Sequence, residues 1–84
     1  MHYVYILQAI AEPKVFYVGC SSDLRARLKS HNAGENQSTK KYQWKLVYYE
    51  AYLSLSAART REYRLKQNGK AKYQLLKRIQ EHLE

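Results

Sequence analysis

The chain has 84 residues, which is enough for one small domain and too few for two. We therefore expect residues 1–84 to form a single domain. Its 15 Lys and Arg residues outnumber its 7 Asp and Glu residues, so the formal net charge is +8 at pH 7. This charge favours an anionic partner, nucleic acid before an acidic membrane surface, with a basic surface that serves only solubility as the alternative.

Several protein classes are excluded by the same composition. No apolar run approaches the roughly 18 residues of a membrane-spanning helix, and no signal peptide is recognisable at the N-terminus. The single cysteine, Cys20, cannot form an internal disulfide or a cysteine-rich zinc site. These features predict a cytoplasmic protein without a membrane partner.

The first elements in chain order form a predicted β-hairpin. Residues 3–7 are rich in β-branched and aromatic side chains, which is typical of a strand. A turn over residues 11–14 leads to a second strand over residues 15–18, and we expect Gly19 to stop it. The hydroxyl and carboxylate side chains of residues 21–23 then predict the N-terminus of a helix.

The rest of the chain contains the other predicted strand and the three predicted helices. The first helix is expected to end near Asn32, and residues 35–43 form a polar, exposed loop before a strand over residues 44–53. Ser54 or Ser56 caps a second helix that runs to about Gln67, and a third helix covers residues 70–83. Its predicted apolar stripe consists of Tyr73, Leu76, Ile79 and Leu83.

The order β-β-α-β-α-α predicts the α+β class. We expect a small three-stranded, mainly antiparallel sheet flanked by helices. Strand alternation places Tyr5 and Tyr17 on the same face of the hairpin, where their rings can lie side by side. Such a pair can simply stabilise the sheet, or it can present two phenols to a functional site.

Polar side chains also occur on helix faces where apolar ones are expected. In the first helix, His31 lies within the stripe of Leu24 and Leu28, and Arg27 borders it. In the second helix, Glu62 is the only acid among several basic residues. Its carboxylate can pair with Lys66 one turn later, or it can bind a divalent cation.

These inward polar residues suit phosphodiester hydrolysis. The reaction needs an activated water, positive charge to stabilise the pentacoordinate phosphorane, and a proton for the leaving oxygen. A tyrosine is a poor base near neutral pH unless nearby positive charge stabilises its phenolate. A single carboxylate favours a one-metal site over a two-metal site.

At these residues the sequence resembles the GIY-YIG endonuclease superfamily. The first motif corresponds to residues 3–5 and the second to residues 17–19. Arg27 and His31 follow Tyr17 by ten and fourteen positions, as they do in the family. The resemblance extends to the third strand and to Glu62. It is closest to the short stand-alone bacterial members, which are similar to the GIY-YIG nuclease domain found in bacterial excision repair.

The resemblance implies a metal-dependent endonuclease that cuts DNA, with RNA as the other substrate to consider, in repair or recombination. Glu62 would bind Mg²⁺ or Mn²⁺, and Arg27 would stabilise the phosphorane. Tyr5 and Tyr17 would contact the attacking water and the scissile phosphate, and His31 would assist the leaving group or orient Tyr17. Structure-selective cutting is expected only by analogy with the family. The remaining cations would follow the phosphate backbone: Lys40, Lys41, Lys45, Arg59, Arg64, Lys70 and Lys72.

Two positions depart from the family pattern. Tyr3 stands at the glycine of the first motif, and Asn68 is the one candidate for the family's late asparagine, although Asn68 and Gly69 equally suit a helix stop. A non-catalytic nucleic-acid-binding module that keeps the fold is the main alternative function. A partner protein on the last helix is a weaker one. Both a monomer and a transient dimer are compatible with the sequence.

Overall fold

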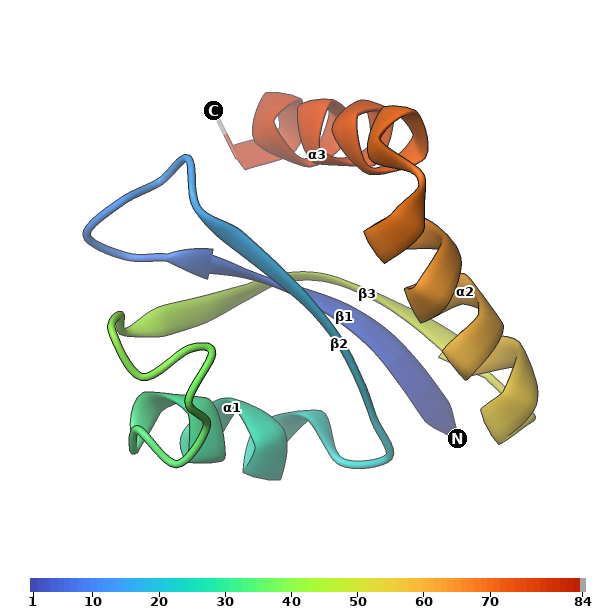
Figure 1. Ribbon diagram of the computed structural model, residues 1–84, viewed down its shortest axis with the longest axis horizontal. Coiled ribbons are helices and arrows are strands. Elements are labelled where there is room, and N and C mark those ends of the chain that lie inside the picture. The colour runs from blue at the N-terminus through green and yellow to red at the C-terminus, as the bar shows by residue number, and fades with distance from the viewer. Residues whose placement is uncertain (84) are drawn as a thin grey trace.

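Six elements follow one another in the computed structural model, which describes residues 1–83. Their order is β-β-α-β-α-α, as the sequence predicts (Figure 1). The α+β class is therefore confirmed, and helix ends agree with their predicted positions to within one residue. The elements are β1 His2–Ala9, β2 Phe16–Ser21, α1 Leu24–Asn32, β3 Trp44–Tyr52, α2 Leu55–Gln67 and α3 Gly69–Leu83.

The sheet has β1 at its centre, with the strand order β2-β1-β3 and antiparallel pairing on both sides. One irregularity interrupts the pairing of β1 with β3: Ile6 pairs with Tyr48, whereas the next residue of β1 pairs with Leu46. The extra residue, Val47, is a β-bulge. Because of this bulge, Val47 and Tyr48 both pack into the same hydrophobic cluster.

Gly19 lies inside β2, so the prediction that it stops the strand is wrong. It pairs directly with Tyr5 of β1, and the Tyr5 ring lies over the glycine backbone. A Cβ atom at residue 19 would overlap the hydroxyl oxygen and ring carbons of Tyr5. The glycine therefore makes room for a neighbouring aromatic ring, and β2 continues beyond it to Ser21.

Residues close in sequence cap the helices. The carboxylate of Asp23 accepts a hydrogen bond from the backbone N–H of Ala26 at 3.0 Å, so Asp23 is the N-cap of α1. Gly34, just beyond the end of this helix, has a φ of 77°, which favours glycine. Ser54, not Ser56, caps α2.

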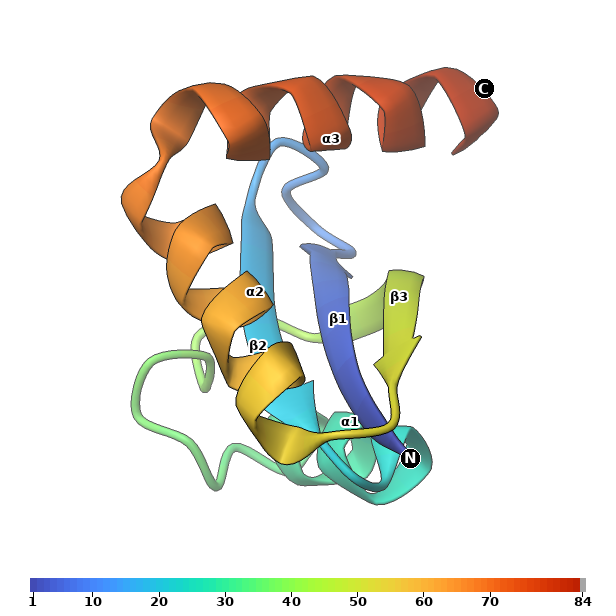
Figure 2. The ribbon, with the colours of Figure 1, turned by 90° about the vertical axis from the view of Figure 1, so that its right-hand side faces the viewer.

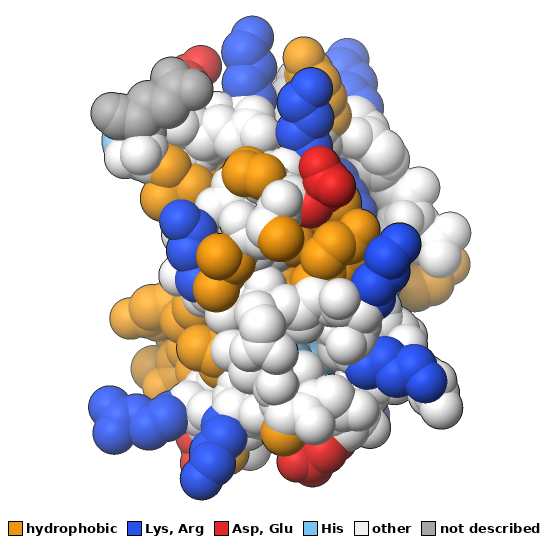
Figure 3. Space-filling model, turned by 90° about the vertical axis from the view of Figure 1, so that its left-hand side faces the viewer, with side chains coloured by type: hydrophobic (Ala, Val, Ile, Leu, Met, Phe, Trp, Pro, Cys, Tyr) orange, Lys and Arg blue, Asp and Glu red, His pale blue; other side chains and the backbone are white. Residues whose placement is uncertain are grey.

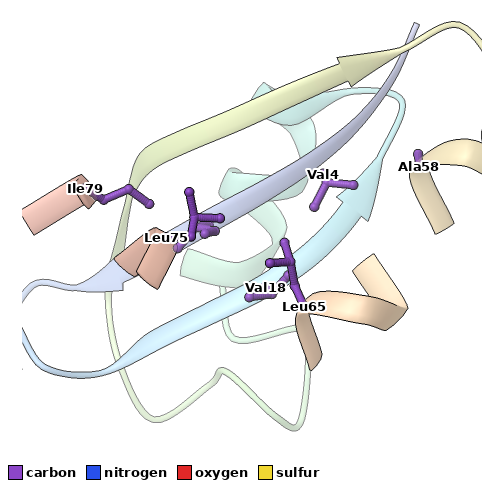
Figure 4. Packing of buried hydrophobic residues seen from close by; sticks show 7 residues of the cluster. Val4, Val18, Ala58, Leu65, Leu75 and Ile79 are labelled. Atoms are coloured by element: carbon purple, nitrogen blue, oxygen red, sulfur yellow. The ribbon is translucent and has the colours of Figure 1, made fainter. Parts of the chain in front are cut away.

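Two hydrophobic clusters cover the two faces of the sheet. Helices α2 and α3 pack on one face, and α1 packs on the other (Figure 2). The first cluster joins the sheet residues Val4 and Val18 to α2 and α3, as Figure 4 shows. The second, around Leu7 and Trp44, includes the half-buried Tyr17 and Leu28 of α1. Tyr5 also lies on the α1 side, so the two tyrosines of the candidate site share that face.

The predicted apolar stripe of α3 is correct only in part. Leu76 and Ile79 pack against the core, but Tyr73 and Leu83 are 66% and 47% exposed. The missing member is Leu75, which is 5% exposed. Leu75 and Ile79 lie one turn apart on the buried side, whereas Tyr73 points well away from them and Leu83 lies in the last turn, beyond the core.

The segment between α1 and β3 is not uniformly exposed, which corrects the prediction for residues 35–43. Thr39 is fully buried. Its carbonyl oxygen accepts a hydrogen bond from the indole N–H of Trp44 at 2.8 Å. Hydrogen bonds of Thr39 with Trp44 and with His31 of α1 thus hold the middle of the loop inside the molecule. None of the helices within residues 1–83 is long and apolar enough to cross a membrane.

Candidate active site

The two tyrosines meet where β1 and β2 run beside α1. Their ring centroids are 6.4 Å apart, with the planes inclined at 60°. They are diagonal neighbours, because Tyr5 pairs with Gly19 and Tyr17 pairs with Leu7. The His31 ring of α1 completes the group, with its centroid 5.0 Å from that of Tyr17. An edge-on aromatic cluster of this kind stabilises the sheet and also brings two phenols to one place.

A chain of buried polar groups runs through this cluster. The Tyr5 hydroxyl lies 2.8 Å from Nε2 of His31, and Nδ1 of His31 lies 2.7 Å from Oγ1 of Thr39. The three side chains are 2%, 1% and 0% exposed. A neutral imidazole has one donor and one acceptor nitrogen, so both ring nitrogens are satisfied. By hydrogen bonding His31 therefore contacts Tyr5, not Tyr17.

The side chains of this hydrogen-bonded group are uncharged near neutral pH. Burial raises the pKa of the Tyr5 phenol, and the neighbouring Arg27 guanidinium partly offsets the rise. Burial also lowers the pKa of His31, and the positive charge of Arg27 lowers it further. These shifts favour a neutral phenol at Tyr5 and a neutral imidazole at His31. The hydrogen bond between them then joins two uncharged groups.

Arg27 links the buried chain to an open cleft. It lies on α1 one turn before His31 and is largely exposed. Its interaction with Tyr5 raises the pKa of the guanidinium. The cleft has a volume of about 470 Å³, and Arg27 and Glu62 both line it. The other lining residues are His2, Cys20, Ser21, Ser22, Leu55 and Arg59.

Glu62 forms the ion pair that one interpretation of the sequence predicts and also lies in the cleft. Its Oε2 is 3.1 Å from Nζ of Lys66, and its side chain is 23% exposed. The same ammonium lies 5.5 Å from the centroid of the Tyr17 ring. Lys66 thus connects the carboxylate of α2 with the second tyrosine.

The donor set fits a water-rich Mg²⁺ or Mn²⁺ ion. Mg²⁺ keeps several waters in proteins and typically takes one or two carboxylates plus substrate phosphates. Among the described residues that line the cleft, Glu62 is the single acid. No group of three or more His, Cys, Asp or Glu residues within residues 1–83 forms a closed metal cage. Glu62 would hold such an ion. Ser21 and Ser22 line the same cleft, and the Ser21 hydroxyl is bonded to the backbone of Asp23.

The predicted backbone-tracking cations do not gather at one place. Arg59 lines the cleft, whereas Arg64 borders a hollow beside Tyr52 and Arg61. Figure 3 shows Lys and Arg side chains spread over one face of the molecule, with apolar surface between them. The others lie in the loop before β3 (Lys40, Lys41), on β3 (Lys45) and in the first turn of α3 (Lys70, Lys72).

Asn68 has a local structural contact. Its Oδ1 accepts a hydrogen bond from the backbone N–H of Ala71 at 3.1 Å, at the start of α3. It also ends α2, where its own N–H bonds to the carbonyl of Arg64. These contacts match the helix-stop interpretation, and Asn68 is not among the residues that line the cleft.

Sequence reasoning missed two groups. Thr39 carried no signal, because nothing in a polar loop distinguishes its one buried residue. Glu50 of β3 forms a two-point ion pair with Arg61 of α2, at 2.9 and 3.0 Å, and accepts hydrogen bonds from the hydroxyls of Tyr48 and Tyr52. Glu50 alternates with Tyr48 and Tyr52 on the face of β3 that lies toward α2. An acid between two aromatic residues on one strand face was an available signal.

Comparisons with known proteins identify the family of the chain. A family model described as the GIY-YIG catalytic domain matches residues 1–74. A UPF0213 protein of Haloquadratum walsbyi is 35% identical over 77 residues, covering 89% of this chain and 84% of that protein. A UPF0213 protein of Streptococcus pyogenes serotype M3 is 37% identical over 62 residues, covering 71% of this chain.

The chain spans 65% of the streptococcal relative, just under two thirds of its length. No solved structure matches the chain. GIY-YIG domains are generally endonucleases and typically depend on a divalent metal. The segment that matches the family model contains both tyrosines, the arginine and histidine of α1, and Glu62. The chain therefore belongs to the GIY-YIG catalytic domain family, together with its UPF0213 relatives.

Proposed function

We propose that this protein is a metal-dependent endonuclease that hydrolyses phosphodiester bonds of DNA, with a preference for branched or otherwise distorted structures that occur in repair and recombination. One observation carries the proposal: Arg27 and Glu62, from different helices, line the same open cleft beside the buried Tyr5. A basic and an acidic group that line one open cleft suit a phosphate with a cation on one side.

In this proposal the guanidinium of Arg27 binds the scissile phosphate. Its planar fork can donate two hydrogen bonds to phosphate oxygens and stabilise the negative charge of the phosphorane. Arg59 lines the same cleft and adds positive charge there. A divalent ion held by Glu62 would polarise the phosphate and neutralise charge on the leaving oxygen.

The two tyrosines would act on the attacking water. Tyr17 is half-buried and lies beside Lys66, whereas Tyr5 is buried and joined to His31. The hydrogen bond between the Tyr5 hydroxyl and Nε2 of His31 fixes the direction of the phenol O–H. His31 would therefore orient Tyr5, which differs from the role beside Tyr17 that the family resemblance suggested.

A cleavage assay tests this function. Purified protein is incubated with flap, branched and continuous duplex DNA, and with the matching RNA, in Mg²⁺ or Mn²⁺. We expect cleavage of DNA, with losses of about 100-fold or more for Arg27→Ala and Glu62→Gln. Arg25→Ala and Glu81→Gln serve as controls, because both residues are exposed and lie outside the cleft.

Two outcomes would contradict the proposal. One is the absence of cleavage on every substrate, with salt-sensitive DNA binding retained, which would support the non-catalytic binding module instead. The other is cleavage that Glu62→Gln and Arg27→Ala leave intact, which would point to a contaminating nuclease.

A further inference from the structure

An aromatic hollow adjoins the candidate active-site cleft. Tyr3 of β1 and Tyr49 of β3 form an edge-to-face pair with ring centroids 5.7 Å apart and planes inclined at 76°. Tyr49 is 55% exposed, so its ring is accessible to a ligand. The pair lines a hollow of about 280 Å³ together with Ser22, Asp23 and Leu24.

The hollow and the cleft share one residue. Ser22, in the turn between β2 and α1, lines both. A ligand with its phosphate beside Arg27 in the cleft can therefore extend past Ser22 into the hollow. In a nucleotide the phosphate and the base are joined through a single sugar, so two adjacent sites are the arrangement that one nucleotide needs.

The chemistry of the hollow suits a base better than a second phosphate. Two phenol rings and the Leu24 side chain offer faces and edges for a flat, weakly polar ring system. Asp23 contributes a carboxylate, which repels phosphate and accepts hydrogen bonds from base N–H groups. The volume lies below the range of about 300–1,000 Å³ typical of pockets that enclose whole drug-sized ligands.

We propose that Tyr3 and Tyr49 bind an unpaired nucleobase of the DNA strand whose phosphate occupies the Arg27 cleft. This inference rests on the proposed nuclease function and specifies its substrate class. A base inside a duplex is covered on both faces by its neighbours, so only an unpaired base can enter the hollow. The site therefore selects flaps, single-stranded ends or distorted positions over continuous duplex.

A binding experiment in EDTA tests the inference without cleavage. Fluorescence anisotropy measures the affinity of the protein for a duplex with a short flap, for the same flap made abasic, and for continuous duplex. Aromatic stacking on a base is worth enough that we expect Tyr49→Ala to weaken flap binding by about 5- to 100-fold. Binding of the abasic flap and of the duplex should be unchanged.

Matched variants separate stacking from folding and from surface charge. Tyr49→Phe keeps the ring and should bind the flap as the wild type does. Tyr63→Ala removes a tyrosine of α2 that is 65% exposed and outside the hollow, so it should also bind normally. Circular dichroism melting checks that Tyr49→Ala remains folded at the assay temperature.

The outcomes distinguish this inference from the proposed function. If Tyr49→Ala binds the flap like the wild type, or loses as much affinity for the abasic flap, the base-binding site is wrong. Cleavage by the wild type in Mg²⁺ would in that case leave the nuclease function intact. If the wild type neither binds nor cuts any DNA, both the base-binding site and the nuclease function are wrong.

Discussion

The Tyr5 hydroxyl lies 2.8 Å from Nε2 of His31, and neither side chain is more than 2% exposed. The two residues are 26 positions apart and come from the central strand and from α1. A polar contact sealed in the interior of so small a protein costs stability unless every group has a partner. Within residues 1–83, no buried side-chain nitrogen or oxygen lacks one. Thr39 completes the set by pairing with the other ring nitrogen of His31.

We predict that Thr39→Val destabilises the protein by about 1–3 kcal/mol, because it leaves Nδ1 of His31 buried without a partner. Valine has nearly the shape of threonine, so the loss comes from the hydroxyl and not from a cavity. Chemical denaturation measures the free energy of unfolding. ¹⁵N NMR of the imidazole should also show a mixture of tautomers in place of a single one.

The conservative change Thr39→Ser keeps the hydroxyl and should restore the single tautomer. Thr60→Val is the control, because Thr60 is exposed on α2. Equal tautomer populations in the wild type and Thr39→Val would show that this hydroxyl does not orient His31.

Gly19→Ala should displace the Tyr5 ring. The added methyl group overlaps the phenol of Tyr5, so either the ring or the pairing of β1 with β2 must move. Overpacking of this kind typically costs about 1–3 kcal/mol, and we expect the His31 hydrogen bond to break at the same time. Urea denaturation and the NMR signal of the His31 ring measure the two effects.

Gly69→Ala is the matched control for this change. Nothing lies within 4 Å of a Cβ atom at residue 69, which is the first residue of α3. This variant should be neutral or more stable by up to about 1 kcal/mol, because alanine favours helices. A Gly19→Ala protein as stable as Gly69→Ala would contradict the packing argument.

Local signals predicted most of the fold, since strand propensity and capping residues act over a few positions. The N-cap of α2 and the helix end at Asn32 are examples. The errors came from contacts between distant segments. Gly19 has a strand-breaking propensity, and only the Tyr5 ring across the sheet explains why it stays in β2.

In the candidate site, too, local relationships were predictable from the sequence and contacts between distant segments were not. The spacing of Arg27 and His31 on one helix was readable because helix geometry fixes it. Thr39 was not, because it reaches His31 through a loop whose path depends on Trp44. The i,i+4 relation of Glu62 and Lys66 was visible as a pair, but the approach of Lys66 to Tyr17 depends on how α2 packs beside β2.

Acid should destabilise the protein through Glu50. Burial alone would raise the pKa of this carboxyl, but hydrogen bonds from Arg61, Tyr52 and Tyr48 outweigh it and hold the pKa at about 2. The unfolded chain, with a pKa near 4.5, binds a proton first as the pH falls. The stabilisation is therefore complete above pH 4.5 and is lost between pH 4.5 and 2, by about 3 kcal/mol.

Denaturation of the wild type and Glu50→Gln across this pH range measures the effect. At pH 6 the variant should be less stable, because Arg61 loses its charged partner. The difference between the two proteins should shrink toward pH 2. Glu81→Gln, an exposed change on α3, should show no such convergence. A constant difference between wild type and Glu50→Gln at all pH values would exclude the low pKa.

Lys66 should compete with a metal for Glu62. Its ammonium lies 3.1 Å from the carboxylate and repels any cation that approaches. Because a partly exposed pair contributes about 0.2–1 kcal/mol, we expect Lys66→Met to tighten Mn²⁺ binding by up to about fivefold. Methionine keeps the length of the side chain beside the Tyr17 ring. Titration calorimetry or the electron paramagnetic resonance signal of free Mn²⁺ measures the affinity without any DNA.

Two further variants are controls for the Mn²⁺ titration. Glu62→Gln should remove the tight Mn²⁺ binding, and Lys70→Met should leave it unchanged, because Lys70 is exposed and outside the cleft. Weaker Mn²⁺ binding by Lys66→Met would reverse the argument. The lysine would then hold the carboxylate in its binding position, and the pair would assist the metal instead of competing with it.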